Sequence, residues 1–155
     1  MTSSYEHEIS VPLPVTDALQ LFTPKGEEAW IDHWRPTYVQ PTDGRTEKDM
    51  IFTTGDGDDM TFWTCLDWEP DEGRVRYLRV TPASRVTFVE VECRPTAKGT
   101  NVKVQYQFVA LNERGNQFIA GIGPADFAKM IESWSDMIEG HLHKGLPRAI
   151  PHAIN

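Results

Sequence analysis

The 155-residue chain is poor in the features that mark membrane, secreted and nucleic-acid-binding proteins. It has two cysteines, Cys65 and Cys93, which are too few for a disulfide scaffold. No apolar run approaches the roughly 18 residues of a membrane span, and the opening residues, MTSSYEHEIS, lack the basic and apolar regions of a signal peptide. Lys and Arg total 15 against 23 Asp and Glu, and the resulting charge of −8 disfavours anionic partners. We therefore expect a cytoplasmic protein without membrane insertion or a nucleic-acid partner.

Signatures of metal, cofactor and nucleophile sites are equally scarce. His141 and His143 are two residues apart on a predicted helix, so their side chains point to nearly opposite sides and do not form a chelate. Asp56, Asp58 and Asp59 lack the ligand spacing and closing glutamate of an EF-hand. The chain has no phosphate-binding loop and no Gly-x-Ser-x-Gly elbow. We expect no metal and no cofactor, and catalytic residues are not identified by any motif.

The composition is that of an ordinary globular domain, with 39% hydrophobic and 25% charged residues. A chain of this length buries about 68–70% of its unfolded surface, which is enough for one core without disulfides or metals. We expect a single domain over residues 1–155, with its core at about 5–145 and a flexible tail at 146–155.

Hydrophobic periodicity predicts a run of strands between two helical regions. Alternation and turn residues predict strands over 5–13, 37–40, 50–54, 60–68, 74–81, 85–94 and 100–111. Short helices are predicted over 15–22 and 27–34, separated by a break at 23–26, with another short helix over 113–122. A long helix follows Pro124 and can close at Gly145 in a left-handed conformation.

These elements predict an α+β fold. An antiparallel sheet with one apolar face must cover that face, and the long C-terminal helix is the only element large enough to do so. We therefore expect a curved antiparallel sheet of about six to seven strands wrapped around that helix, with two short helices after the first strand. Aromatic residues on the facing surfaces either line a cavity or simply fill the core.

One stretch of sequence carries a family resemblance. Residues 22–30 read FTPKGEEAW and are followed by Trp34; further along come Trp63, Tyr77 and Trp134. This pattern resembles one bacterial branch of the helix-grip superfamily, which includes the START, polyketide cyclase-like and Bet v 1-like (SRPBCC) proteins. The resemblance covers about residues 5–145. Members of this superfamily share a shape but differ in function, so the resemblance supports the fold more than any activity.

The resemblance implies an internal cavity that binds a small apolar or aromatic molecule, in a monomer or weak homodimer. The candidate lining residues are Trp30, Trp34, Trp63, Tyr77, Arg79, Tyr106, Phe108, Phe127, Met130 and Trp134. A cyclase-, aromatase- or hydrolase-like enzyme acting in the same cavity is the first alternative. It needs polar groups such as Glu27 or His33 to converge on one point. A protein-interaction module of the co-chaperone kind is the second, and it predicts a filled interior with an exposed apolar patch.

The sequence leaves open whether the side chain of Arg79 faces the interior or the solvent. If Val75 and Tyr77 face inward, strict alternation turns Arg79 inward too, where it needs a partner or an anionic ligand. Leu78 and Val80 are also apolar, however, and a bulge would turn Arg79 outward. Both orientations therefore stay open at the level of sequence.

Overall fold

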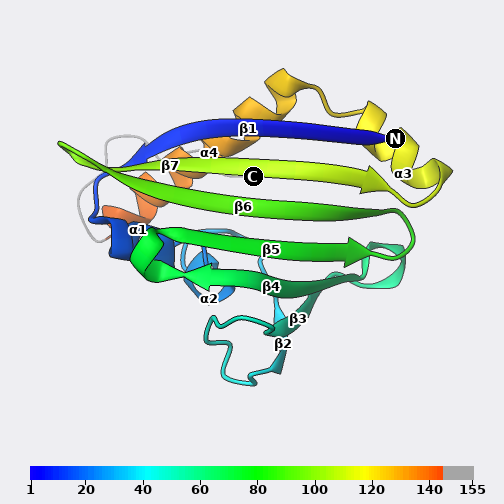
Figure 1. The fold of residues 1–155 in the computed structure, drawn as a ribbon, viewed down its shortest axis with the longest axis horizontal. Coiled ribbons are helices and arrows are strands. Elements are labelled where there is room, and N and C mark those ends of the chain that lie inside the picture. The colour runs from blue at the N-terminus through cyan, green and yellow to red at the C-terminus, as the bar shows by residue number, and fades with distance from the viewer. Residues whose placement is uncertain (145–155) are drawn as a thin grey trace.

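The computed structural model describes residues 1–144 and places seven strands in one antiparallel sheet (Figure 1). The strands are β1 (Thr2–Val11), β2 (Thr37–Gln40), β3 (Ile51–Thr54), β4 (Thr61–Glu69), β5 (Arg74–Thr81), β6 (Arg85–Thr96) and β7 (Gly99–Ala110). The helices are α1 (Val15–Gln20), α2 (Pro24–Glu27), α3 (Glu113–Ala120) and α4 (Pro124–Leu142), with short 3₁₀ turns η1 (Gly57–Asp59) and η2 (Pro70–Glu72). The predicted cap at Gly145 and tail at 146–155 lie outside the described residues.

The strand order is β1-β7-β6-β5-β4-β3-β2. Strands β2 to β7 are neighbours in the order in which they follow along the chain, so each pairs with the next through a short connection. Strand β1 pairs with β7 and completes the sheet on that side. Every predicted strand range overlaps an observed strand, and the predicted helix-grip arrangement is confirmed: Figure 1 shows α2 and α4 behind the sheet.

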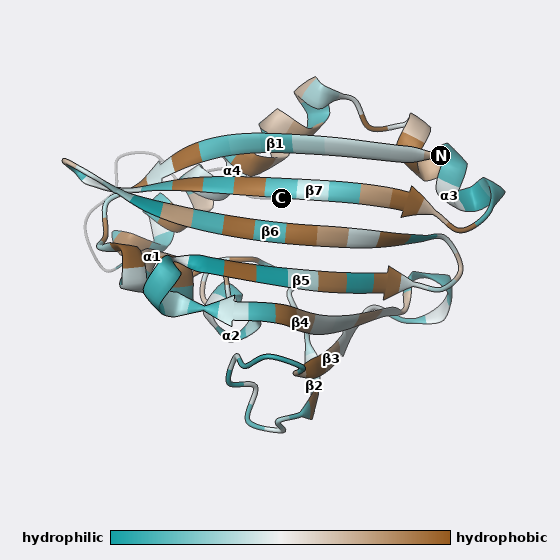
Figure 2. Ribbon diagram, in the orientation of Figure 1, coloured by the Kyte–Doolittle hydropathy of each residue, from teal (hydrophilic) through white to brown (hydrophobic). Residues whose placement is uncertain are grey.

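The core lies between α4 and the face of the sheet that points toward it, which we call the inner face. Along β7, Val102, Val104 and Tyr106 are buried, while the residues between them face outward. Figure 2 shows this alternation as hydrophilic and hydrophobic bands along the central strands. From α4, Phe127 and Ile131 are buried against this face. Period-2 alternation in the strands and the three-to-four spacing in the helix therefore meet in one apolar layer.

The second short helix begins earlier than the sequence predicted. We expected a break over 23–26 and a helix over 27–34, whereas α2 spans Pro24–Glu27. The Thr23 hydroxyl accepts a hydrogen bond from the amide of Gly26 (2.9 Å) and caps the helix. The proline that follows has a fixed φ suited to the first helical position, so this Thr-Pro pair starts a helix instead of breaking one.

Three aromatic side chains, which we call the aromatic clamp, bind the backbone where α1 passes into α2. The indole of Trp30 donates to the Leu21 carbonyl (2.8 Å), the hydroxyl of Tyr77 to the Phe22 carbonyl (2.9 Å) and the indole of Trp34 to the Pro24 carbonyl (2.8 Å). Carbonyls buried without a partner would be costly, so these bonds fix the turn firmly against the inner face of β5.

The same turn leaves no room for a side chain at Gly26. A Cβ atom there would lie 1.8 Å from the carbonyl oxygen of Gln20. We predict that Gly26→Ala lowers the free energy of unfolding by about 1–3 kcal/mol, because the backbone must shift to relieve the clash. Gly121→Ala is the matched control, since its Cβ would meet nothing closer than 3.5 Å. Urea denaturation measures both; equal stability of the two variants would contradict this packing.

Candidate functional site

Arg79 lies on the inner face of the sheet. Its direct partners are Trp63 on β4 and Thr87 on β6, and Thr87 is fully buried. Residues directly opposite one another in antiparallel strands project to the same face, so all three point toward α4. A bulge does occur in this region, but it lies between Cys65 and Asp67 on β4. Strand β5 keeps its alternation, and this decides the orientation that the sequence left open.

The Arg79 guanidinium lies between two aromatic rings. Its central carbon is 5.2 Å from the centroid of the Trp63 ring and 5.1 Å from that of Tyr106. Within residues 1–144, no carboxylate oxygen comes within the 4.0 Å of its nitrogens that would make an ion pair. The guanidinium therefore makes cation–π contacts while its charge lacks an anionic partner.

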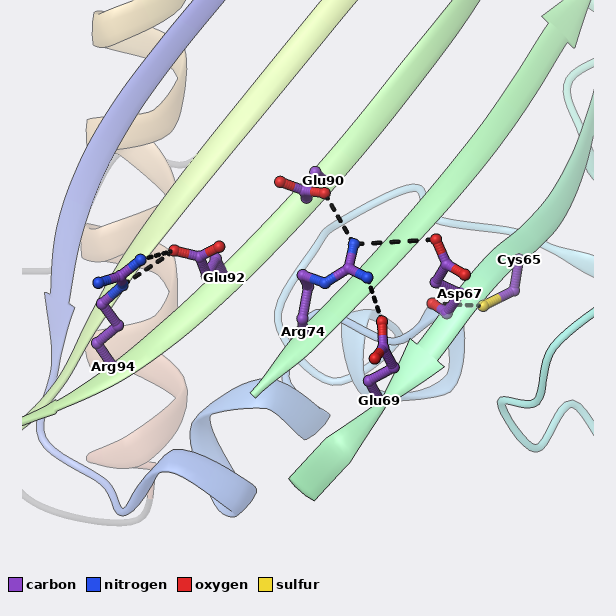
Figure 3. Close-up of polar contacts among 7 residues, drawn as sticks. All are labelled: Cys65, Asp67, Glu69, Arg74, Glu90, Glu92 and Arg94. Carbon is purple, nitrogen blue, oxygen red and sulfur yellow. Dashed lines mark hydrogen bonds and ion pairs between the residues drawn. The ribbon is translucent and has the colours of Figure 1, made fainter. Parts of the chain in front are cut away.

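Arg74, on the outer face of the same strand, is the opposite case (Figure 3). Its guanidinium lies 3.0 Å from Glu90 and 3.8 Å from Asp67, and it also bonds Glu69. Three carboxylates thus surround an arginine that is partly exposed to solvent. The chain thus pairs Arg74 with three carboxylates on the outer face, and within residues 1–144 it leaves Arg79 on the inner face without an ion pair.

Glu27, the last residue of α2, lies within reach of the positive charge of Arg79. Burial raises the pKa of Glu27 from its usual 4.5 to about 8, and the positive charge of Arg79 offsets this only in part. At neutral pH this carboxyl is therefore mostly protonated, and it can donate a hydrogen bond as well as accept one.

Two tyrosines complete the polar part of the site. Burial, and after it the charge of Glu27, raises the pKa of Tyr77, whose hydroxyl is already bound in the aromatic clamp. Burial also raises the pKa of Tyr106, although the nearby Arg79 opposes this effect. Because its pKa is raised, the Tyr106 phenol keeps its proton at neutral pH and can donate it in a hydrogen bond.

Aromatic rings surround these polar groups in two clusters. Trp63 stacks on Phe52, with ring centroids 5.2 Å apart, and meets the edge of Trp34 at 5.7 Å. Trp134 packs against Trp30 at 5.9 Å, and it lies 6.5 Å from the ring of Tyr106. Trp34, Trp63 and Trp134 pack against the apolar core, and each keeps accessible surface.

A surface groove of about 390 Å³ runs along α4 and reaches Trp134. Its lining includes Ile31, Lys129, Met130 and Met137. Met130 is 38% exposed, so it belongs to this groove and not to the interior group in which the sequence analysis placed it.

The structure brings together most of the other predicted residues. Trp63, Arg79, Tyr106 and Trp134 surround one region. The remaining members serve mainly in packing: Trp30, Trp34 and Tyr77 form the clamp, and Phe108 and Phe127 are buried beside Tyr106. Glu27 was considered from the sequence as part of the FTPKGEEAW stretch and as a polar group that an enzyme would need, but no local signal marked its carboxyl as buried.

Other polar residues considered from the sequence lie elsewhere. His33 is exposed and has a positive φ of 64°, so it does not line the interior. Cys65 and Cys93 are buried free thiols on strands separated by β5, and burial raises the pKa of both to about 12. The described residues contain no group of three His, Cys, Asp or Glu side chains placed to hold a metal ion. Nor does any helix in residues 1–144 have the length and apolar character to cross a membrane.

No protein-family model and no curated protein matches this chain. Solved structures do. MLL2253 from Mesorhizobium loti is 14% identical with a TM-score of 0.65, covering 92% of this chain and 98% of that one. Norcoclaurine synthase from Thalictrum flavum, in complex with dopamine and hydroxybenzaldehyde, is 11% identical with a TM-score of 0.61, covering 96% and 90%. Ara h 8.0201 is 13% identical with a TM-score of 0.61, covering 92% and 98%.

These similarities establish the fold. The chain has the same helix-grip fold as norcoclaurine synthase and Ara h 8.0201, and this is the fold that the resemblance in its sequence implied. At such low identity the functions of the matched proteins do not carry over, so the interior residues must indicate the function.

The raised pKa of Glu27 predicts how stability depends on pH. The folded chain holds this proton up to about pH 8, whereas an ordinary glutamate releases it near 4.5. Glu27 therefore costs no stability below about pH 4.5, and stability falls as the pH rises toward 8. In Glu27→Gln this loss is absent, so the variant gains stability relative to the parent between pH 5 and 8. Thermal melting of both proteins across this range measures the difference; a constant difference would contradict the assignment.

Proposed function

We propose that this protein binds a small apolar or aromatic molecule in a cavity between the inner face of the sheet and α4. The observation that carries the proposal is the set of inward polar groups, Glu27, Arg79 and Tyr106, which lie among aromatic rings without full pairing. Binding sites for small molecules combine apolar walls with a few convergent polar groups in this way.

Two further observations support a space that a ligand enters. Trp63 and Trp134 pack against the core yet keep accessible surface, and the groove along α4 leads to Trp134 and suits an opening. Norcoclaurine synthase, which has the same fold, is known in complex with dopamine and hydroxybenzaldehyde, both of them small aromatic molecules. We propose the cytoplasm as the place of action, where the free thiols of Cys65 and Cys93 stay reduced.

An enzyme of the cyclase, aromatase or hydrolase kind is the second candidate. A general acid–base works best with a pKa near the working pH, and burial brings that of Glu27 to about 8. The charge of Arg79 acts on the Tyr106 hydroxyl, so a guanidinium and a phenol donor would together stabilise negative charge that develops on a substrate. The interaction-module alternative predicts a filled interior, and the accessible tryptophans favour the binding proposal over it.

The binding proposal predicts ligand-induced stabilisation that depends on the inner tryptophans. In a thermal-shift screen of aromatic metabolites, lipids and sterol-like compounds, one chemical class should raise the melting temperature. At about 100 times the dissociation constant, a ligand adds some 2.7 kcal/mol, a shift of several degrees. Trp63→Ala should abolish this shift. Trp68→Ala is the control, because Trp68 lies at the far end of the same strand. The absence of a shift from the whole library would count against the proposal.

The enzyme alternative makes a separate prediction about Glu27. If a bound compound is turned over, Glu27→Gln should lower kcat by about 10²–10⁴, the usual contribution of a general acid–base, and change affinity by less than about twofold. Mass spectrometry of the compound after incubation with each protein measures turnover. Equal turnover by parent and variant would remove Glu27 from the chemistry.

A further inference from the structure

The inner face carries more positive charge than the described residues neutralise. Besides Arg79, the residues that share this face by register include Arg85, which lies two positions before Thr87 on β6. The central carbon of its guanidinium sits 3.4 Å from the centroid of the Phe118 ring, and within residues 1–144 neither arginine forms an ion pair. In a chain with a net charge of −8, two unpaired arginines on one partly buried face are unexpected.

Neighbouring polar atoms are also without partners. The Thr87 hydroxyl and the Arg85 Nε are both buried, and neither has a hydrogen-bond partner within the part of the chain that the structure describes. Thr87 is the direct cross-strand partner of Arg79, and Arg85 lies diagonally from Arg79, at a typical separation of about 7–8 Å. The unpaired donors therefore gather in one part of the inner face, around Arg79.

Nearby carboxyl groups do not neutralise this charge. The carboxyl group of Glu27 lies within reach of the Arg79 charge, but burial keeps this carboxyl mostly protonated, and so neutral, at neutral pH. Burial lowers the pKa of Arg85, and the negative charge of Asp59 offsets only part of this effect. Asp59 also forms an ion pair with Arg114, 3.6 Å away. Contacts with ring faces do not use the N–H donors of a guanidinium. Arg85 donates one of its five to the Ser84 hydroxyl (3.1 Å), and a planar carboxylate fits two of those that remain on either arginine.

We infer that the ligand of this site carries one anionic group, a carboxylate or a group of the same charge, which Arg79 binds while Trp63 and Trp134 contact its apolar body. This inference rests on the proposed binding function and narrows its ligand class. The Tyr106 hydroxyl lies beside Arg79 and supplies a further donor to the anion. Arg85 adds positive potential from the α3 end of the same face.

A matched pair of fluorescent probes tests the charge separately from the cavity. 8-Anilinonaphthalene-1-sulfonate (ANS) and N-phenyl-1-naphthylamine (NPN) share an aromatic skeleton, but only ANS bears an anion. Both dissociation constants are measured for the parent chain, Arg79→Gln and Arg76→Gln. Arg76 is the control, because it lies on the same strand but on the outer face, 5.0 Å from the Phe88 ring, where a surface groove offers ANS a competing site.

We expect Arg79→Gln to weaken ANS binding at least tenfold, which corresponds to about 1.4 kcal/mol, and to leave NPN binding within twofold. Arg76→Gln should leave both probes within twofold. Arg79→Lys keeps the charge but loses the planar fork, so it should bind ANS with intermediate affinity. Circular dichroism checks that each variant is folded. A second test needs no variant: the two probes are compared on the parent chain at low and high salt, and only ANS binding should weaken as salt rises.

Two results would overturn the inference and leave the proposed function standing. One is that NPN binds, but the affinity for ANS is no more sensitive to Arg79→Gln or to salt than the affinity for NPN is. The other is ANS binding that is lost in Arg76→Gln, which would place the probe on the outer face. Failure of both probes to bind the parent chain would instead remove the proposed function, and this inference with it.

Discussion

The three hydrogen bonds of the aromatic clamp determine how the rest of the interior is arranged. They satisfy carbonyls at a turn where two short helices meet, and neither helix is long enough to be stable alone. Because the donors come from β5 and from the segment after α2, the turn is fixed to the sheet on one side and to its own continuation on the other. With the turn held in this way, α2 places Glu27 where the charge of Arg79 acts on its carboxyl group. The FTPKGEEAW stretch and Trp34 are thus explained first as structural residues.

The clamp also creates the electrostatic conflict at the centre of the molecule. It brings a carboxyl group and a guanidinium into one poorly solvated region, yet it leaves them too far apart to form an ion pair. Two effects then compete for the Glu27 proton: burial favours the neutral acid, and the charge of Arg79 favours the carboxylate. Burial is the larger, so the acid stays neutral and the guanidinium keeps its charge. A region that would be neutral if the two were paired is therefore positive.

Local patterns in the sequence predicted much of the fold, because strand alternation and turn residues act over a few positions. Thr100–Ala110 alternates so regularly that its buried face was plain, and the run from Phe127 to Leu142 has clear helical spacing. The start of α2 was misplaced because Thr-Pro was taken as a break, although the same pair is an N-cap followed by a favoured first residue. The orientation of Arg79 stayed open because its neighbours Leu78 and Val80 are as apolar as the inward residues Val75 and Tyr77, and only the register with β4 and β6 decides it.

The site could be predicted only in part, since its chemistry depends on distances between elements. The tryptophans and Tyr106 were found because large rings on an inner face are recognisable from alternation. The raised pKa of Glu27 was harder to predict, because it depends on burial against other elements of the fold. The four residues of α2 give no local sign of that burial. Glu27 and Arg79 also do little for the fold: an unpaired charge and an acid kept neutral by burial both cost stability. An unpaired charge and a carboxyl kept neutral by burial are typical of functional sites, and a fold shared at 11–14% identity leaves such interior groups free to differ from one protein to the next.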